Sequence, residues 1–164
     1  MLSPDLYLKS IFDLTPNRLK KLGIFALILD VDNTLRAQDE SKPYDGIVDW
    51  IKTMHDAKIM LVISSNNFKK SVEPFAESLN IDYVAMSCKP LPFGLRKAIK
   101  KLSVPKNQIA VVGDQIFTDV IGGKSQGLKT ILVEPIISET GFIYKIKKLL
   151  EKPFLNYYHK KKGK

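Results

Sequence analysis

Short apolar runs alternate along the chain with segments in which apolar residues recur at helical spacing. The longest of these runs, Ile24–Leu29, has six apolar residues in succession and follows Gly23. Such a run is typical of a strand buried on both faces of a parallel sheet. Similar runs predict four further strands, at 59–63, near 83–86, at 109–112 and at 130–133.

Helical patterns fill the intervals between these runs. Apolar residues spaced three and four apart predict helices over 45–57, around 72–79, around 95–102 and up to about Gln126, where Gly127 ends the last one. Alternation of strand and helix is the signature of a doubly wound α/β fold. We therefore predict a five-stranded, parallel, Rossmann-like sheet with helices on both faces.

The two ends of the chain lie outside this alternation. Residues 5–22 contain scattered apolar positions, and Thr15 followed by Pro16 predicts a short helix that Gly23 ends. We expect an N-terminal helical segment over 5–22, packed outside the sheet. A chain of 164 residues without a Gly/Ser linker predicts a single domain, over 1–150, followed by a basic, aromatic C-terminal tail over 151–164.

Positive charge is concentrated near the C-terminus. The formal net charge is +9, and residues 141–164 hold eight lysines against one glutamate, interleaved with aromatic residues. One interpretation is a final helix packed on the sheet with a solvated lysine-rich end. Another is peripheral contact between the tail and an anionic membrane. Binding of nucleic acid is a third, less favoured interpretation.

Composition also bears on the cellular setting. Cys88 is the only cysteine, which favours a reducing, cytoplasmic environment, with the tail allowing peripheral contact with the inner face of the membrane. The sequence shows neither a signal-peptide layout nor an apolar stretch of membrane-spanning length. His55 and His159 have no cysteine or histidine at ligand spacing, which disfavours a zinc site.

Polar residues follow the first four predicted strands. They are Asp30 and Asp32, then Ser65 with Asn66, then Lys89, and finally Asp114 with Asp119 five residues later. Because the carboxyl ends of parallel strands open on one edge, we expect these side chains to converge. Four close carboxylates facing one ammonium require a counterion, and Mg²⁺ is the hard cation that oxygen ligands suit best.

A metal, a lysine and a hydroxyl together form a receptor for a phosphoryl group. A carboxylate can attack phosphorus as a nucleophile, and a second one two residues later can transfer protons. The set therefore predicts a phosphate ester hydrolase.

Four motifs carry a resemblance to a known family. They are Asp30-Val-Asp32-Asn-Thr34, Ser65-Asn66-Asn67, Lys89-Pro90 and Gly113-Asp114-Gln-Ile-Phe-Thr118-Asp119. In this order they resemble the haloacid dehalogenase-like (HAD) phosphatase superfamily, subfamily IIIA, and its YqeG-type branch, over about residues 5–150.

The resemblance implies a role for each residue. Asp30 would be the nucleophile that forms an aspartyl-phosphate, and Asp32 the general acid and base, with Thr34 supporting this loop. Phosphate would be bound by Ser65, Asn66 and Lys89, and Mg²⁺ by Asp30, the Asp32 carbonyl and Asp114. Asp119 would support the metal shell or Lys89. Ser64 stays an alternative to Ser65, which we favour because Asn follows it.

The spacing of the motifs limits what covers the pocket. Only 32 residues separate Asp32 from Ser65, and 23 separate Ser65 from Lys89, which one loop, one helix and one strand use up. We therefore predict no cap domain and an open site.

An open site and a basic tail suit a phospholipid, and the resemblance includes phosphatidylglycerophosphate phosphatases. A small soluble phosphometabolite as the substrate, and a non-enzymatic receiver-like phosphoacceptor, are the alternatives. The sequence makes no prediction of the oligomeric state.

Overall fold

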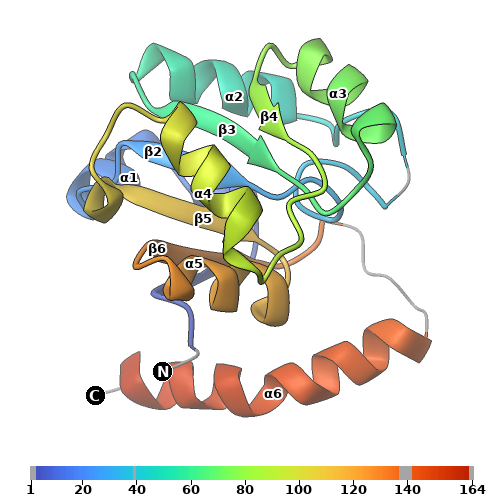
Figure 1. Cartoon of the computed structure of the whole chain (residues 1–164). Coiled ribbons are helices and arrows are strands. Elements are labelled where there is room, and N and C mark those ends of the chain that lie inside the picture. Colours follow the sequence, from blue (N-terminus) through green and yellow to red (C-terminus); the bar gives the residue numbers. More distant parts are fainter. Residues whose placement is uncertain (1–2, 39, 137–141, 163–164) are drawn as a thin grey trace.

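The computed structural model describes residues 3–38, 40–136 and 142–162. Its centre is a parallel sheet of six strands in the order β1-β6-β5-β2-β3-β4 (Figure 1). The strands are β1 (Leu6–Leu8), β2 (Ala26–Leu29), β3 (Met60–Ser64), β4 (Asp82–Val84), β5 (Ile109–Gly113) and β6 (Lys129–Val133). The predicted parallel α/β architecture is confirmed.

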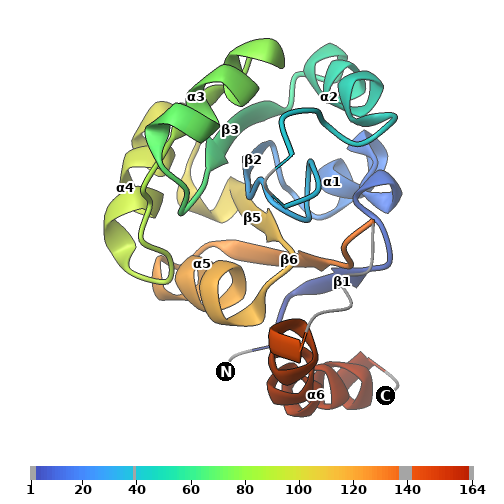
Figure 2. The ribbon, with the colours of Figure 1, turned by 90° about the vertical axis from the view of Figure 1, so that its right-hand side faces the viewer.

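Helices cover both faces of the sheet, as predicted (Figure 2). On one face lie α1 (Pro16–Lys21), α2 (Ile47–Asp56) and α3 (Lys69–Ser78). On the other lie α4 (Pro92–Lys101) and α5 (Ile121–Ser125). In β2, Leu27 and Leu29 face the first layer, whereas Ala26 and Ile28 face the second, so a strand buried on both faces must be apolar throughout.

The N-terminal segment differs from the prediction. Within the expected helical segment 5–22, only α1 is an α-helix, and it begins after the predicted cap, since the Thr15 side chain accepts a hydrogen bond from the Arg18 N–H. Leu6–Leu8 forms a sixth strand, β1, parallel to β6. Three residues are too few to show a strand period, and β1 is fixed by its partner, since Asp5 also exchanges hydrogen bonds with Thr130 of β6. The predicted strand count of five was therefore wrong by one.

The last helix, α6 (Phe142–Lys162), crosses residue 150, where we expected the tail to begin. It packs beside β1 and β6, where Phe154 and Leu155 contact an apolar cluster that includes Ile116. The buried Glu151 carboxylate accepts a hydrogen bond from the Ile116 N–H at 3.0 Å. Within the described ranges, no helix is both long and apolar enough to cross a membrane. The side chains at 142–148, 150 and 161–162, which include lysines of the basic C-terminal region, and residues 163–164 lie outside what the structure describes.

The strand order creates a crevice at one edge of the sheet. From β2 the chain proceeds to β3 and β4 on one side, and β5 and β6 then add on the other side of β2. Residues that follow β2 and β5 therefore lie at the topological switch point, where open α/β sheets bind their ligands. Each crossover between β2 and β6 contains a single α-helix in the described residues, in agreement with the absence of a cap domain.

Gly94 permits a close contact between α4 and the segment that carries Lys89. A β-carbon on Gly94 would lie 2.3 Å from the Ser87 Cα, a distance that main-chain atoms cannot tolerate. An alanine in a helix normally stabilises by about 1 kcal/mol relative to glycine. Here we expect Gly94→Ala to destabilise the fold by roughly 1–3 kcal/mol, measured by urea unfolding, because the helix must move away.

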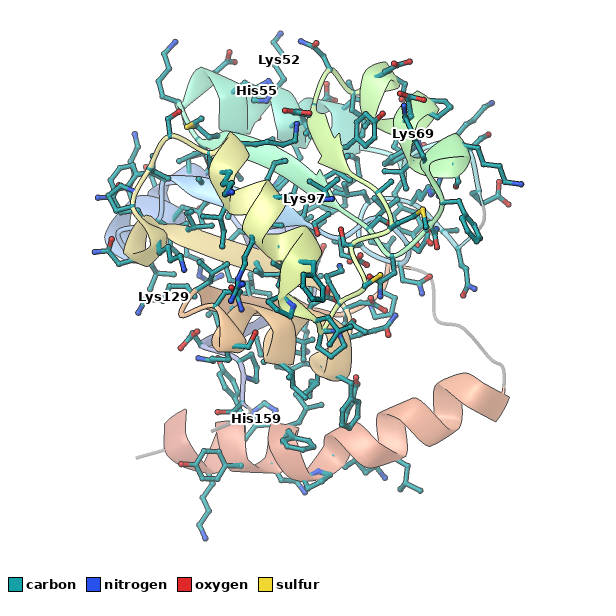
Figure 3. All side chains as sticks on the ribbon, in the orientation of Figure 1. Lys52, His55, Lys69, Lys97, Lys129 and His159 are labelled. Atoms are coloured by element: carbon teal, nitrogen blue, oxygen red, sulfur yellow. The ribbon has the colours of Figure 1, made fainter. Side chains whose placement is uncertain are left out.

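Lys97→Ala is the matched control, since Lys97 is exposed on the same helix and points into solvent (Figure 3). This variant should change the free energy of unfolding by less than about 0.5 kcal/mol. A Gly94→Ala protein as stable as the parent would contradict the close packing of α4 on Ser87.

Candidate active site

Asp30 stands directly after β2, at the switch point. Its N–H donates to the Val112 carbonyl of β5 at 2.9 Å, which continues the sheet by one residue and fixes the main chain. The side chain is 12% exposed, and its Oδ1 lies 2.6 Å from Lys89 Nζ. The main chain of Asp30 is therefore fixed by the sheet, and its partly exposed carboxylate lines the cavity.

Asp32 is oriented by two donors. Its Oδ1 accepts from Arg36 Nε at 2.9 Å, and its Oδ2 accepts from Asn67 Nδ2. The buried Arg36 is itself fixed, because it donates to Ser71 Oγ at 2.9 Å and its guanidinium lies over the Phe75 ring at 4.8 Å. The Asp32 carboxylate consequently has little freedom to rotate.

Thr34 lies in the tight turn that follows, within a loop closed by the hydrogen bond from the Leu35 N–H to the Val31 carbonyl at 2.8 Å. Its hydroxyl is buried, and it has no hydrogen-bond partner among the described residues. The predicted supporting residue is therefore buried and does not line the cavity.

The hydrogen-bond partners of Ser64 and Ser65 show which of the two hydroxyls faces the crevice. Ser64 Oγ is buried 2.9 Å from Ser87 Oγ, away from the crevice. Ser65 Oγ accepts from the Asn67 N–H at 3.2 Å and lines the cavity that Asp30 and Lys89 also line. Ser65 is thus the hydroxyl that faces the crevice.

Asn66 holds the main chain of Lys89 from both sides. Its Oδ1 accepts from the Lys89 N–H at 2.7 Å, and its Nδ2 donates to the Lys89 carbonyl at 3.0 Å. Both ends of the side-chain amide are therefore used to position Lys89. That Asn66 also binds phosphate stays a prediction.

The Lys89 ammonium joins two carboxylates from different loops. Nζ lies 2.6 Å from Asp30 Oδ1 and 2.6 Å from Asp119 Oδ1, and the side chain is only 2% exposed. Burial alone would lower the pKa of Lys89, but the charges of Asp119 and Asp30 outweigh it and raise that pKa above its ordinary value. Lys89 is therefore a permanent positive charge in the site.

Asp114 and Asp119 complete the acidic side of the site. Asp114 follows β5, and Asp119 lies in the π-helical turn Ile116–Val120. The Asp119 carboxylate rests against Gly113, where a β-carbon would come within 2.2 Å of its Cγ, so only glycine fits there. Asp30, Asp114 and Asp119 each offer a carboxylate oxygen, and these oxygens lie within 4.8 Å of one another.

The charges in the site are unbalanced. Burial, with the nearby negative charges of Asp119 and Asp32, raises the pKa of Asp30 to about 7, although Lys89 acts in the opposite direction. Of the three clustered carboxylates, Asp30 and Asp119 are paired with the Lys89 ammonium, while Arg36 is directed to Asp32. A cluster of carboxylate oxygens at this spacing suits a hard divalent cation, which would remove the mutual repulsion.

A cavity of about 160 Å³ lies among these side chains. Besides the predicted Asp30, Asp32, Ser65, Asn66 and Lys89, it is lined by Asn33, Gln38, Asn67, Gln115 and Thr118. Asp114 and Asp119 do not line the cavity, but their carboxylates cluster with that of Asp30, so all predicted site residues except the supporting Thr34 are brought together at one edge of the sheet.

Sequence reasoning did not single out two residues that orient Asp32, namely Arg36 and Asn67. The only signals were the placement of Arg36 four residues after Asp32 and of Asn67 within a quoted motif.

Comparison with known proteins agrees with this geometry. Residues 3–127 match the family model of haloacid dehalogenase-like hydrolases. Over 158 residues the chain is 34% identical to the probable phosphatase YqeG of Bacillus subtilis (strain 168), covering 96% of this chain and 92% of that protein.

Solved structures share the fold at lower identity. The magnesium-bound structure of YfnB from Bacillus subtilis has a TM-score of 0.52 at 17% identity, covering 63% of this chain and 50% of that one. The cobalt-bound deoxy-D-mannose-octulosonate 8-phosphate phosphatase of Haemophilus influenzae has a TM-score of 0.52 at 21% identity, covering 69% and 70%. With the family match and the YqeG likeness, the conclusion is that this chain belongs to the haloacid dehalogenase-like hydrolase family and is a phosphatase.

Proposed function

We propose that the protein is a Mg²⁺-dependent phosphomonoester hydrolase that acts through an aspartyl-phosphate on Asp30. The observation that carries this proposal is the Lys89 ammonium, held 2.6 Å from Asp30 beside a group of three carboxylates. In the first step an Asp30 oxygen attacks phosphorus and the ester P–O bond breaks. The departing oxygen takes the proton of Asp32.

In the second step Asp32 removes a proton from water, whose oxygen attacks phosphorus while the P–O bond to Asp30 breaks. Inorganic phosphate leaves and both carboxyl groups return to their starting states. The hydrogen bonds from Arg36 and Asn67 hold the Asp32 carboxyl group in one orientation at the cavity that it lines. Ser65 and Lys89 would bind the phosphoryl oxygens and stabilise their charge.

Mg²⁺ would be held by Asp30, Asp114 and the Asp32 carbonyl, and it would supply positive charge to the phosphoryl oxygens. The carboxylate spacing supports this assignment. A solved relative with the same fold is bound to magnesium. Asp119, which bonds Lys89 and rests on Gly113, would act by orienting Lys89.

Phosphatidylglycerophosphate in a membrane is the substrate that we propose. The cavity has a volume of about 160 Å³, and no inserted cap lies over it in the described residues, so a large substrate would extend beyond it. Lysines on α6 would attract the anionic membrane. A soluble phosphometabolite is the alternative.

Replacing the nucleophile tests the chemical proposal. Asp30→Asn should abolish phosphate release from p-nitrophenyl phosphate, because an amide oxygen is a poor nucleophile. Asp32→Asn should lower turnover by about 10²–10⁴-fold through loss of proton transfer. Asp82→Asn, a carboxylate exposed on β4 and paired with Lys101, is the matched control and should keep full activity.

Acid quenching adds a second readout. Radioactive phosphate from a labelled substrate should be trapped on the parent protein and not on Asp30→Asn. Activity or labelling retained in Asp30→Asn would overturn the role given to Asp30.

Metal dependence is tested by chelation and by ligand replacement. EDTA should remove activity and added Mg²⁺ should restore it. Mg²⁺ should also raise the melting temperature of the parent protein, because a bound ion stabilises the folded state. Asp114→Asn should lose this stabilisation and need more Mg²⁺ for half-maximal rate, whereas Asp82→Asn should behave as the parent. Full activity in EDTA would refute the proposed cation.

The substrate proposal is tested by competition between classes of ester. We expect the ratio kcat/KM for phosphatidylglycerophosphate in vesicles to exceed that for soluble sugar and nucleotide phosphates by at least about tenfold. Equal or greater turnover of a soluble ester would exclude the lipid and support the alternative. A stable phosphoprotein without turnover on any ester would instead support a phosphoacceptor.

A further inference from the structure

The loops that build the cavity carry large apolar side chains exposed to solvent. Five of them form what we call the apolar rim, with exposures from 37% for Phe117 to 66% for Phe68: Phe68, Met86, Leu91, Phe93 and Phe117. Isolated apolar residues on a surface are ordinary, but a group gathered around one opening marks a contact surface.

Each rim residue is close in the chain to a residue of the site. Phe68 directly follows Asn67, which bonds Asp32, and the Met86 N–H donates to the Asn67 carbonyl at 2.9 Å. Leu91 and Phe93 follow Lys89, and the Leu91 N–H donates to the Cys88 carbonyl at 2.8 Å.

The fifth rim residue, Phe117, lies on the other side of the crevice. It stands between Gln115 and Thr118, which line the cavity. Its ring meets Phe154 of α6 edge to face, with centroids 5.8 Å apart. The rim thus extends from the start of α3, past the start of α4, to the contact with α6.

Exposed lysines lie at one end of this rim, and the other end lies toward a lysine-containing part of α6. Lys69 and Lys70 are exposed in the first turn of α3, and Figure 3 shows Lys69 at the outer end of that helix. At the other end, the N-terminal end of α6 extends toward the side of the molecule where the strands end (Figures 1 and 2). This part of α6 contains three lysines in its sequence and the exposed Leu149.

We propose that the apolar rim is a docking surface for an anionic lipid bilayer, into which Phe68, Met86, Leu91 and Phe93 insert around the phosphate pocket. This inference rests on the proposed function and deepens it. Aromatic and aliphatic side chains bordered by lysines are the composition of interfacial membrane contacts. A flat lipid surface also presents phosphate esters at the depth of the headgroups, which the small central cavity can receive without a lid.

The helix-starting positions of two rim residues allow clean variants. Phe68 is the N-cap of α3, where serine is a preferred residue, and Phe93 lies in the first turn of α4. The double variant Phe68→Ser/Phe93→Ser should therefore fold as the parent does. Leu22→Ser/Phe25→Ser is the matched control, because both side chains are exposed by more than a third near the start of β2, at the opposite edge of the sheet.

Binding is measured by co-sedimentation with vesicles of equal parts phosphatidylglycerol and phosphatidylcholine. All proteins carry Asp30→Asn, so that binding is read without turnover. The parent and control proteins should bind, less so in high salt or to phosphatidylcholine alone. The rim variant should bind at least about tenfold more weakly. With Asp30 intact, the rim variant should hydrolyse p-nitrophenyl phosphate at the parental rate.

Two outcomes would overturn the docking surface. One is a rim variant that binds vesicles as tightly as the control, and the other is a parent protein that does not bind vesicles at all. Neither outcome would contradict the proposed aspartyl-phosphate on Asp30, which the labelling experiment tests separately.

Discussion

The buried Lys89 ammonium is the interaction on which the site depends. It joins a carboxylate that follows β2 to one that lies beyond β5, each at 2.6 Å, and its own main chain is held by Asn66 after β3. A charge this deeply buried is tolerated only when it is paired. Loops from four different strands are therefore fixed relative to one another by a single cation. Gly113 and Gly94 contribute by letting main chain and side chain approach where a methyl group would not fit.

Much of this arrangement could be predicted from the sequence, because the signals were local and strong. The strand Ala26–Leu29 faces two helical layers, so its apolar character had to be continuous, and Asp30 had to emerge at its carboxyl end. The strand β1 could not be predicted, since its three residues are defined by β6 and not by their own pattern. Arg36 and Asn67 were missed for a related reason, because their importance comes from meeting Asp32 in space.

The polarity of the crevice changes sharply from its floor to its edge. At the floor, acidic groups outnumber the available ammonium, and their oxygens are arranged for a small, hard cation. At the edge, exposed phenyl and aliphatic groups dominate. The lipid ester that we propose as substrate, charged at one end and apolar at the other, would suit both regions. The cavity between them is small, about 160 Å³.

Through Glu151, the C-terminal helix α6 contacts the turn that carries Asp119. Its carboxylate receives the Ile116 N–H at the beginning of the turn that carries Asp119, and negative charge at such a position complements the exposed N–H groups. The ring of Phe154 supports the same turn through Phe117. A chain shortened before Glu151 would retain every residue that lines the cavity. It would lose the hydrogen bond to the Ile116 N–H and the contact between Phe154 and Phe117. Part of the support for the turn that carries Asp119 thus comes from outside the four motifs.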